Sequence, residues 1–324
     1  MDPALFLADL EEKPARLGDL AAALRAGNDW GISAADAERS WLLLGMGSSG
    51  YAAQVAAARL RARGVRAVAE NAATDLLPRL DAGATVVAIT ASGGSAETLD
   101  ACRRLRSQGR AARFVAMTNV VDSPVVDLCD DVVPMWAGHE AGGVACRTYQ
   151  HTVAQVLALE ASLGGGLDVP SLLDRAAEAC AHLLAGRGDW LPALSDALLG
   201  PDGTHVVAPA HRLGSALQSA LMLREGPRLP AYGCETADWS HVDVYLTKTT
   251  DYRMLLLAGS RWEDELLTWV RERGSTLVAV GGDVPGAALT LRYPHDDVDD
   301  VRLLTETLVA ELLAAHAWTL SRAF

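Results

Sequence analysis

The chain has 324 residues, half of them hydrophobic and 21% charged, with 28 Lys and Arg against 41 Asp and Glu for a net charge of −13. This length fits two domains of roughly 150 residues, and the apolar content excludes a disordered or fibrous chain. The acidic balance argues against non-specific nucleic-acid binding, and no run approaches the ~20 apolar residues of a membrane span. Because the start is acidic (Asp2, Asp9, Glu11, Glu12) and unlike a secretory signal, we expect a soluble, cytoplasmic protein without nucleic-acid or membrane partners.

The lysines and cysteines limit the chemistry that the chain can perform. Lys13 and Lys248 are the two lysines, so a mechanism that needs a Schiff base has only these candidates. The five cysteines are odd in number and none are spaced as CxxC, which favours free, buried thiols over a zinc site or a disulfide framework. We expect no metal and no other cofactor.

The first half of the chain predicts a helical arm and then a parallel sheet. Leucines recur near helical spacing over residues 5–27, with a break at Pro14. Short apolar runs follow at 41–44, 85–89 and 113–117, and helix-like stretches follow the first two runs, at 52–63 and from residue 95 to about 107. Such alternation indicates βαβ units, whose ligands bind at the C-terminal ends of the strands.

The second half repeats this plan. Strands are expected over 204–208, 253–258 and 276–281, with helices over 213–225 and 262–273. We therefore expect two copies of one α/β unit, joined near residues 163–185. A final helix over about 301–322 follows an acidic run, in which a metal site is less well supported than helix capping and compensation of the helix dipole. The acidic residues are Asp296, Asp297, Asp299 and Asp300.

Two loops have the features of a phosphate-binding site. Gly45-Met46-Gly47-Ser48-Ser49-Gly50 and Thr90-Ala91-Ser92-Gly93-Gly94-Ser95 each lead from an expected strand into an expected helix. Unpaired N–H groups and the dipole at a helix start attract anions, hydroxyls add donors, and glycines allow close approach. The alternative is that the serines only cap helices and the glycines only form turns. The presence of both loops on one sheet favours ligand binding, although neither matches the P-loop or GxGxxG pattern.

Further segments make a family resemblance specific. They are Glu140 to Thr148 with Val144-Ala145-Cys146, the run Ala220-Leu221-Met222-Leu223-Arg224-Glu225, and His241, 16 residues after Glu225. Together with the serine loops and an N-terminal Glu11-Glu12-Lys13-Pro14, they resemble the sugar isomerase (SIS) family, in particular the two-domain isomerase half of glucosamine-6-phosphate synthase. The resemblance implies two tandem SIS domains, each a flavodoxin-like parallel β-sheet flanked by helices in three αβα layers. These would be residues 31–165 and 180–324, after an arm of residues 1–30.

The resemblance also implies roles for individual residues. Glu225 would move a proton between C1 and C2 of a sugar, and His241, reaching across the interface of a homodimer, would open the sugar ring. Gln218 shares a helical face with Met222 and Glu225 and is expected to touch the same ligand. The remaining residues would contact the sugar or its phosphate: Ser48, Ser49, Thr90, Ser92, Gly93, Ser95, Val144 and Cys146.

Departures from the family pattern limit which activity of the family we expect. Met222 replaces a family lysine, His241-Val242-Asp243 replaces His-Gly-Pro, and Thr90-Ala91-Ser92-Gly93 lacks the glutamine of SQSG. No lysine follows Lys248 and no glutamine-hydrolysing domain precedes residue 1, so a complete glucosamine-6-phosphate synthase is not expected. We expect a phosphosugar isomerase, or an amino-sugar phosphate isomerase, deaminase or deglycase, that uses Glu225. The alternatives are a non-catalytic phosphosugar sensor and an enzyme for a modified or unphosphorylated sugar.

Overall fold

The computed structural model describes residues 1–321, and the chain divides into two compact units. The first, here called the β1–β5 unit, contains Arg16–His139 and Arg147–Leu173. The second, the β6–β10 unit, contains Met1–Ala15, Glu140–Cys146 and the chain from Asp174 onward. None of the helices within residues 1–321 is long and apolar enough to cross a membrane.

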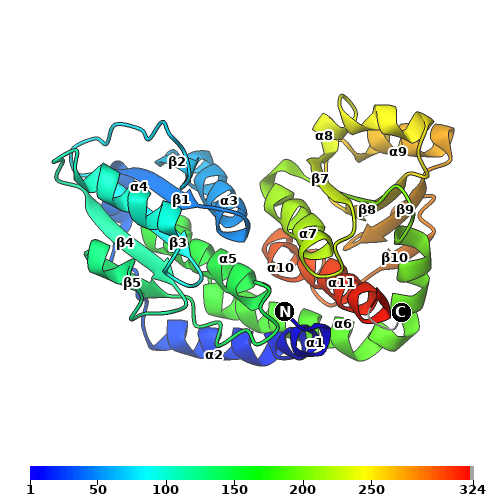
Figure 1. The fold of residues 1–324 in the computed structure, drawn as a ribbon, viewed down its shortest axis with the longest axis horizontal. Helices are drawn as coiled ribbons and strands as arrows, with labels where there is room; N and C mark the ends of the chain where they lie inside the picture. The colour runs from blue at the N-terminus through cyan, green and yellow to red at the C-terminus, as the bar shows by residue number, and fades with distance from the viewer. Residues whose placement is uncertain (322–324) are drawn as a thin grey trace. The chain divides into compact units, whose positions relative to one another are not determined.

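The β1–β5 unit is built on a parallel five-stranded sheet in the order β2-β1-β3-β4-β5. Leu42 and Leu44 pack with α4 on one face, while α3 and α5 cover the other, which gives three layers (Figure 1). The strands are β1 (Ser40–Gly45), β2 (Arg66–Asn71), β3 (Thr85–Thr90), β4 (Arg113–Thr118) and β5 (Asp131–Pro134). The helices are α2 (Lys13–Ala26), which begins just before this unit, α3 (Ser48–Ala62), α4 (Ala96–Arg106) and α5 (Arg147–Glu160), with 3₁₀ turns at Ala34–Glu38 and Val126–Leu128.

The β6–β10 unit has the same topology, with its parallel strands in the order β10-β9-β8-β6-β7. Helix α9 packs with Met254 and Leu256 on one face, and α7, which packs on α11, covers the other (Figure 1). The strands are β6 (Thr204–Ala208), β7 (Ala231–Glu235), β8 (Arg253–Leu257), β9 (Thr276–Val280) and β10 (Leu289–Leu291). The helices are α1 (Pro3–Glu11), α6 (Val169–Leu198), which enters from the other unit, α7 (Leu213–Glu225), α8 (Thr236–Trp239), α9 (Glu263–Arg273), α10 (Asp299–Thr305) and α11 (Thr307–Ser321).

The structure confirms the expected fold class and corrects several element boundaries. The first helix after β1 begins at Ser48 rather than at residue 52, so both serines of that loop lie in its first turn. The expected connection at 163–185 is largely the long helix α6. The single C-terminal helix is instead α10 and α11, interrupted at Glu306, and Arg322 lies outside the described residues.

Candidate functional site

The two serine loops lie at neighbouring strand ends of the first sheet. Strands β1 and β3 are adjacent and parallel, and the helices that follow them, α3 and α4, pack on opposite faces. This is the topological switch point of a doubly wound sheet, where the two chain connections diverge and leave room for a ligand. The expectation that both loops occur at equivalent strand ends of one sheet is therefore confirmed.

The loop after β1 presents two unengaged hydroxyls. Ser48 and Ser49 are half-buried in the first turn of α3, and neither hydroxyl forms a hydrogen bond with the described residues. Gly47 has φ +52°, and a Cβ on Gly45 would lie 2.6 Å from the Ser49 backbone, so glycine is needed for α3 to start this close to the strand. A small cavity of about 90 Å³ at this turn is lined by Gly45, Met46, Gly47, Gly50, Tyr51, Gln54, Ala69, Glu70 and Asn71.

In the loop after β3, one hydroxyl side chain caps a helix and two others remain free to donate to a ligand. Ser95 caps α4, since its hydroxyl accepts from the Thr98 N–H at 3.4 Å and donates to Glu97 at 2.9 Å. Thr90 is 6% exposed and Ser92 is exposed, and neither hydroxyl donates to the described residues. The capping hypothesis thus accounts for Ser95, while Thr90 and Ser92 keep free donors.

Gly93 fixes the shape of this second loop. Its φ is +67°, a region that favours glycine, and a Cβ there would lie 1.8 Å from the Ser123 hydroxyl oxygen. Its carbonyl also accepts from the Val125 N–H at 3.0 Å. Gly93 therefore acts through packing, whatever the neighbouring hydroxyls bind.

Three more of the expected site residues come together in the β6–β10 unit. Val144 and Cys146 are 2% and 0% exposed, and the Gln218 side chain of α7 donates to the Ala145 carbonyl at 3.0 Å. The Gln218 carbonyl oxygen is buried without a partner in residues 1–321, so it still has a lone pair to offer. Burial, together with the charge of Glu140, raises the pKa of the Cys146 thiol well above its ordinary value, so this thiol is not a nucleophile at neutral pH.

Glu225 is the last residue of α7 and has the properties of a general base. It is half-buried and forms no hydrogen bond or ion pair with the described residues. Burial raises the pKa of its carboxyl group, against a smaller opposing effect of Arg224. A carboxylate at a helix C-terminus is also disfavoured by the helix dipole, so a structural reason for its position is missing.

His241 lies on an exposed segment of the same unit. It follows α8, and no hydrogen bond or ion pair connects its side chain to Glu225. Val242, Tyr245 and Leu246, all in or beside the 3₁₀ turn Asp243–Lys248, are 55%, 63% and 41% exposed. The structure therefore does not bring the two expected catalytic residues into contact within one chain.

The two lysines have different environments. Lys13 is fully buried and pairs with Glu311 at 2.5 Å. Burial, the largest single influence, lowers the pKa of Lys13, but the Glu311 carboxylate together with smaller contributions from Cys146 and Cys180 outweighs it, and the pKa lies above its ordinary value. A buried, charged amine cannot attack a sugar carbonyl, which leaves the exposed Lys248 as the lysine able to form a Schiff base.

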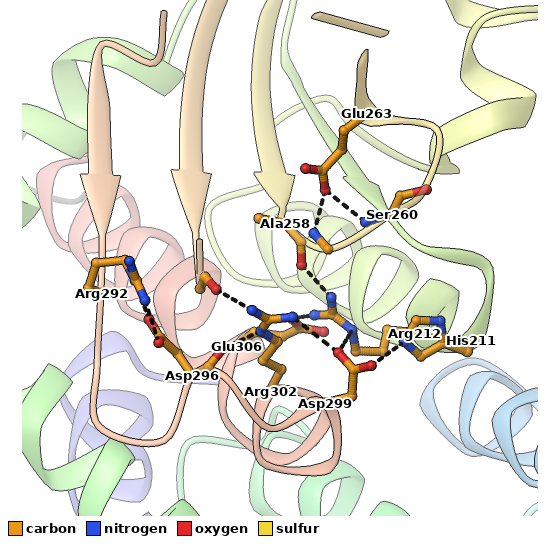
Figure 2. Close-up of polar contacts among 12 residues, drawn as sticks. His211, Arg212, Ala258, Ser260, Glu263, Arg292, Asp296, Asp299, Arg302 and Glu306 are labelled. Atoms are coloured by element: carbon orange, nitrogen blue, oxygen red, sulfur yellow. Dashed lines mark hydrogen bonds and ion pairs between the residues drawn. The ribbon is translucent and has the colours of Figure 1, made fainter. Parts of the chain in front are cut away.

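At the corresponding strand ends of the second sheet, charged side chains replace the free hydroxyls. Figure 2 shows the Glu263 carboxylate accepting from the N–H groups of Gly259 and Ser260 after β8, while Arg212 donates to the Ala258 carbonyl and to Glu306. Sequence reasoning missed the Arg212 contacts of this network, because Arg212 lies 46 residues from Ala258 and 94 from Glu306 in the chain.

The acidic run before α10 belongs to the same network. Asp296 pairs with Arg292, and Asp299 pairs with Arg302 and lies in the first turn of α10 with Asp300 (Figure 2). The positions of Asp299 and Asp300 in the first turn agree with compensation of the helix dipole, but the N-cap residue is Val298, whose apolar side chain forms no capping hydrogen bond, so the capping part of the expectation is wrong. No group of three or more His, Cys, Asp or Glu within residues 1–321 has a geometry that could hold a metal.

Comparison with known protein families identifies the part of the chain that contains the first sheet. A model of the SIS domain matches residues 35–163. These residues are a SIS domain. The SIS domain contains both serine loops, whereas Glu225 and His241 lie beyond the matched range.

Curated relatives share the sequence over part of their length. The chain is 32% identical over 157 residues to the isomerizing glutamine–fructose-6-phosphate aminotransferase of Symbiobacterium thermophilum, covering 46% of this chain and 25% of that protein. It is 25% identical over 297 residues to the enzyme of the same name from Pyrococcus horikoshii, covering 85% of this chain and 48% of that protein. The chain therefore matches at most about half the length of these two relatives.

Solved structures share the fold beyond the matched SIS domain. The C-terminal domain of glucosamine-fructose-6-phosphate aminotransferase from Francisella tularensis superposes with a TM-score of 0.84 at 16% identity, covering 99% of both chains. Tagatose-6-phosphate ketose/aldose isomerase from Escherichia coli gives 0.79 at 14% identity, covering 99% of this chain and 95% of that one. Glucosamine-6-phosphate deaminase from Thermotoga maritima gives 0.76 at 16% identity with the same coverages. At these identities the likeness establishes the fold, which extends over both sheets.

Proposed function

We propose that the chain is a phosphosugar isomerase in which Glu225 transfers a proton between C1 and C2 of the substrate. The observation that carries the proposal is the Glu225 carboxylate itself, half-buried, without a hydrogen-bond partner in residues 1–321 and with a raised pKa. Aldose–ketose conversion needs one base that removes a proton from one carbon and returns it to the next, through an enediol. A carboxylate with a modestly raised pKa suits this step at neutral pH.

The phosphate would bind at the switch point of the SIS domain. Ser48, Ser49, Thr90 and Ser92 have hydroxyls that donate to no described residue, and the α3 N-terminus adds backbone N–H groups. Neutral donors of this kind hold a phosphate without lysine. The names of the structural neighbours, a ketose/aldose isomerase and a deaminase of sugar phosphates, support this substrate class.

A homodimer would supply His241 to the site of a neighbouring subunit. The segment that carries His241 exposes three large apolar side chains, Val242, Tyr245 and Leu246, and such clusters mark protein interfaces. Sedimentation at the concentrations used for the activity assay tests this part of the proposal. A monomer in the presence of full activity would contradict the role of His241 in a neighbouring site.

The substitution Glu225→Gln tests the catalytic role. Glutamine keeps the shape of the side chain but cannot carry the proton, so we expect kcat to fall by at least about 10²-fold. Binding of the sugar phosphate, measured by calorimetry, should change less than about twofold because the lost step is chemical. Undiminished turnover would contradict the assignment.

Glu272→Gln is the matched control. Glu272 is preceded by an arginine near the C-terminus of α9, as Glu225 is near the C-terminus of α7, but it is exposed. Its replacement should leave turnover unchanged.

A ligand panel defines the substrate class and tests the alternatives. Hexose, pentose and amino-sugar phosphates are compared with their unphosphorylated parents by thermal unfolding, where a ligand at 100 times its Kd stabilises by about 2.7 kcal/mol. Saturable binding by the wild type without interconversion of isomers would indicate a sensor. Stabilisation by a parent sugar and not by its phosphate ester would indicate an enzyme for unphosphorylated sugars.

A further inference from the structure

The segment Glu140–Cys146 is held by residues 1–15, the part of the expected N-terminal arm that belongs to the β6–β10 unit and is here called the arm. In the chain this segment lies between β5 and α5, yet it packs with the arm in the β6–β10 unit. The Asp9 carboxylate, 4% exposed, accepts from the Ala141 N–H at 3.2 Å and from the Gly142 N–H at 2.7 Å. The Asp2 N–H donates to the Gly142 carbonyl at 3.3 Å.

The arm and the segment also touch backbone to backbone. A Cβ on Gly142 would lie 2.5 Å from the Cα of Phe6, so only glycine allows α1 to lie this close. Phe6 is itself fully buried and lies near Trp318 of α11, with the two rings tilted and their centroids 6.1 Å apart. The contact is therefore anchored in the core of the unit.

The same segment is held at its other end by internal bonds and by α7. The Glu140 carboxylate accepts from the Cys146 N–H at 2.7 Å, and Gln218 donates to the Ala145 carbonyl at 3.0 Å. The buried Lys13–Glu311 pair lies close enough to the Cys146 thiol to affect its pKa. Since Gln218 and Glu225 are both on α7, the arm fixes the segment relative to the helix that carries Glu225.

We propose that the N-terminal arm is a positioning element of the active site, with Asp9 as its principal positioning residue. By binding the N–H groups of Ala141 and Gly142, Asp9 fixes Val144 and Cys146, the residues that the family resemblance places against the sugar. This inference rests on the proposed function for the binding of a sugar there. Asp9 touches no reacting atom, so its loss weakens substrate positioning and leaves the proton transfer by Glu225 chemically intact.

The first test measures the position of the segment without reference to activity. In the wild type, Cys146 and Cys180 are both fully buried, and alkylation by iodoacetamide, mapped by peptide mass spectrometry, should be slow at both. Asp9→Ala should speed alkylation of Cys146 by at least about tenfold relative to Cys180, because local release of the segment exposes only the former. Asp9→Asn, which retains one acceptor, should give a smaller increase.

Glu11→Gln is the control for loss of a carboxylate from the arm. Glu11 is an exposed acid of α1 whose partner is Arg187, away from the segment. It should leave both alkylation rates unchanged. Equal increases at Cys146 and Cys180 in Asp9→Ala would mean that the arm serves only global stability, and no increase at either would mean that Asp9 does not hold the segment; both results overturn the proposal.

The second test connects position to function. The substrate in this test is the sugar phosphate that the wild type is found to isomerise. With it, Asp9→Asn should raise KM by at least about tenfold. The apparent pKa of the acid limb of kcat/KM should not change, because that limb reports Glu225. A shift of that limb would overturn the positioning role. So would an unchanged KM in a variant in which alkylation of Cys146 is faster. If the wild type itself turns over no sugar phosphate, the proposed function fails, while the alkylation result still decides whether Asp9 holds the segment.

Discussion

Breaking the buried ion pair between Lys13 and Glu311 should destabilise the protein more than removing it altogether. Both side chains are 0% exposed and their nearest charged atoms are 2.5 Å apart. Lys13→Met leaves a carboxylate buried without its cation, and Glu311→Leu leaves an ammonium group without its anion. Each should cost about 3–5 kcal/mol at pH 7, whereas the double variant should be neutral or more stable by up to about 4 kcal/mol.

The two single variants should respond to pH in opposite directions. Burial raises the pKa of the Glu311 carboxyl group. Without Lys13, native Glu311 binds a proton that the unfolded chain releases, so stability rises as pH falls from 7 toward the pKa of an unfolded glutamate. Without Glu311, burial depresses the pKa of Lys13, so the unfolded chain binds the extra proton and stability rises with pH toward 10.

Urea unfolding measures the free energy of unfolding of the wild type, the two single variants and the double variant. Repeating it across the pH range compares each single variant with the double variant. Glu11→Gln, which breaks the partly exposed pair with Arg187, is the control and should cost about 0–1 kcal/mol. Two single variants with equal, pH-independent losses would refute the reasoning, because the loss would then come from packing and not from an uncompensated charge.

Two further predictions concern the expected site. Gly93→Ala should destabilise the protein by about 1–3 kcal/mol and weaken phosphate-dependent thermal stabilisation, because of its positive φ and the clash with Ser123. Gly94→Ala, where a Cβ meets nothing within 4 Å, should leave both measurements unchanged, and equal effects at the two glycines would contradict this explanation. Arg224→Met should move the acid limb of the kcat/KM profile to higher pH, since Arg224 lowers the pKa of Glu225, and a shift to lower pH would show that another group titrates.

The inner strands of both sheets could be predicted from the sequence, and the edge strands could not. The six runs interpreted as strands became β1, β3, β4, β6, β8 and β9, each with a neighbour on both sides. Their residues are buried on both faces and read as continuous apolar runs. The missed strands β2, β5, β7 and β10 are the four sheet edges, and the half-exposed Arg66–Asn71 illustrates why no apolar run marks them.

The candidate site, too, could be predicted from the sequence only in part. Small hydroxyl residues after a strand identified the serine loops, because strand ends and helix starts are local features of the sequence. The sequence did not show which hydroxyls remain free, since all of these serines lie at helix starts, yet Ser95 caps its own helix while Ser48 and Ser49 do not. The sequence also left open which lysine could act, and burial against Glu311 excluded Lys13.

The sequence by itself therefore determined the fold class, the inner strands and the residue types of the candidate site, because periodicity, strand-end glycines and residue spacing are encoded over short stretches. Only the tertiary structure decided that Glu140–Cys146 packs with the arm and α7 rather than with its neighbours in the chain. The physical reason is that these bonds, from Asp9 to Gly142 and from Gln218 to Ala145, join residues far apart in the chain. Such contacts form only when the core between them is packed, and no local pattern records them.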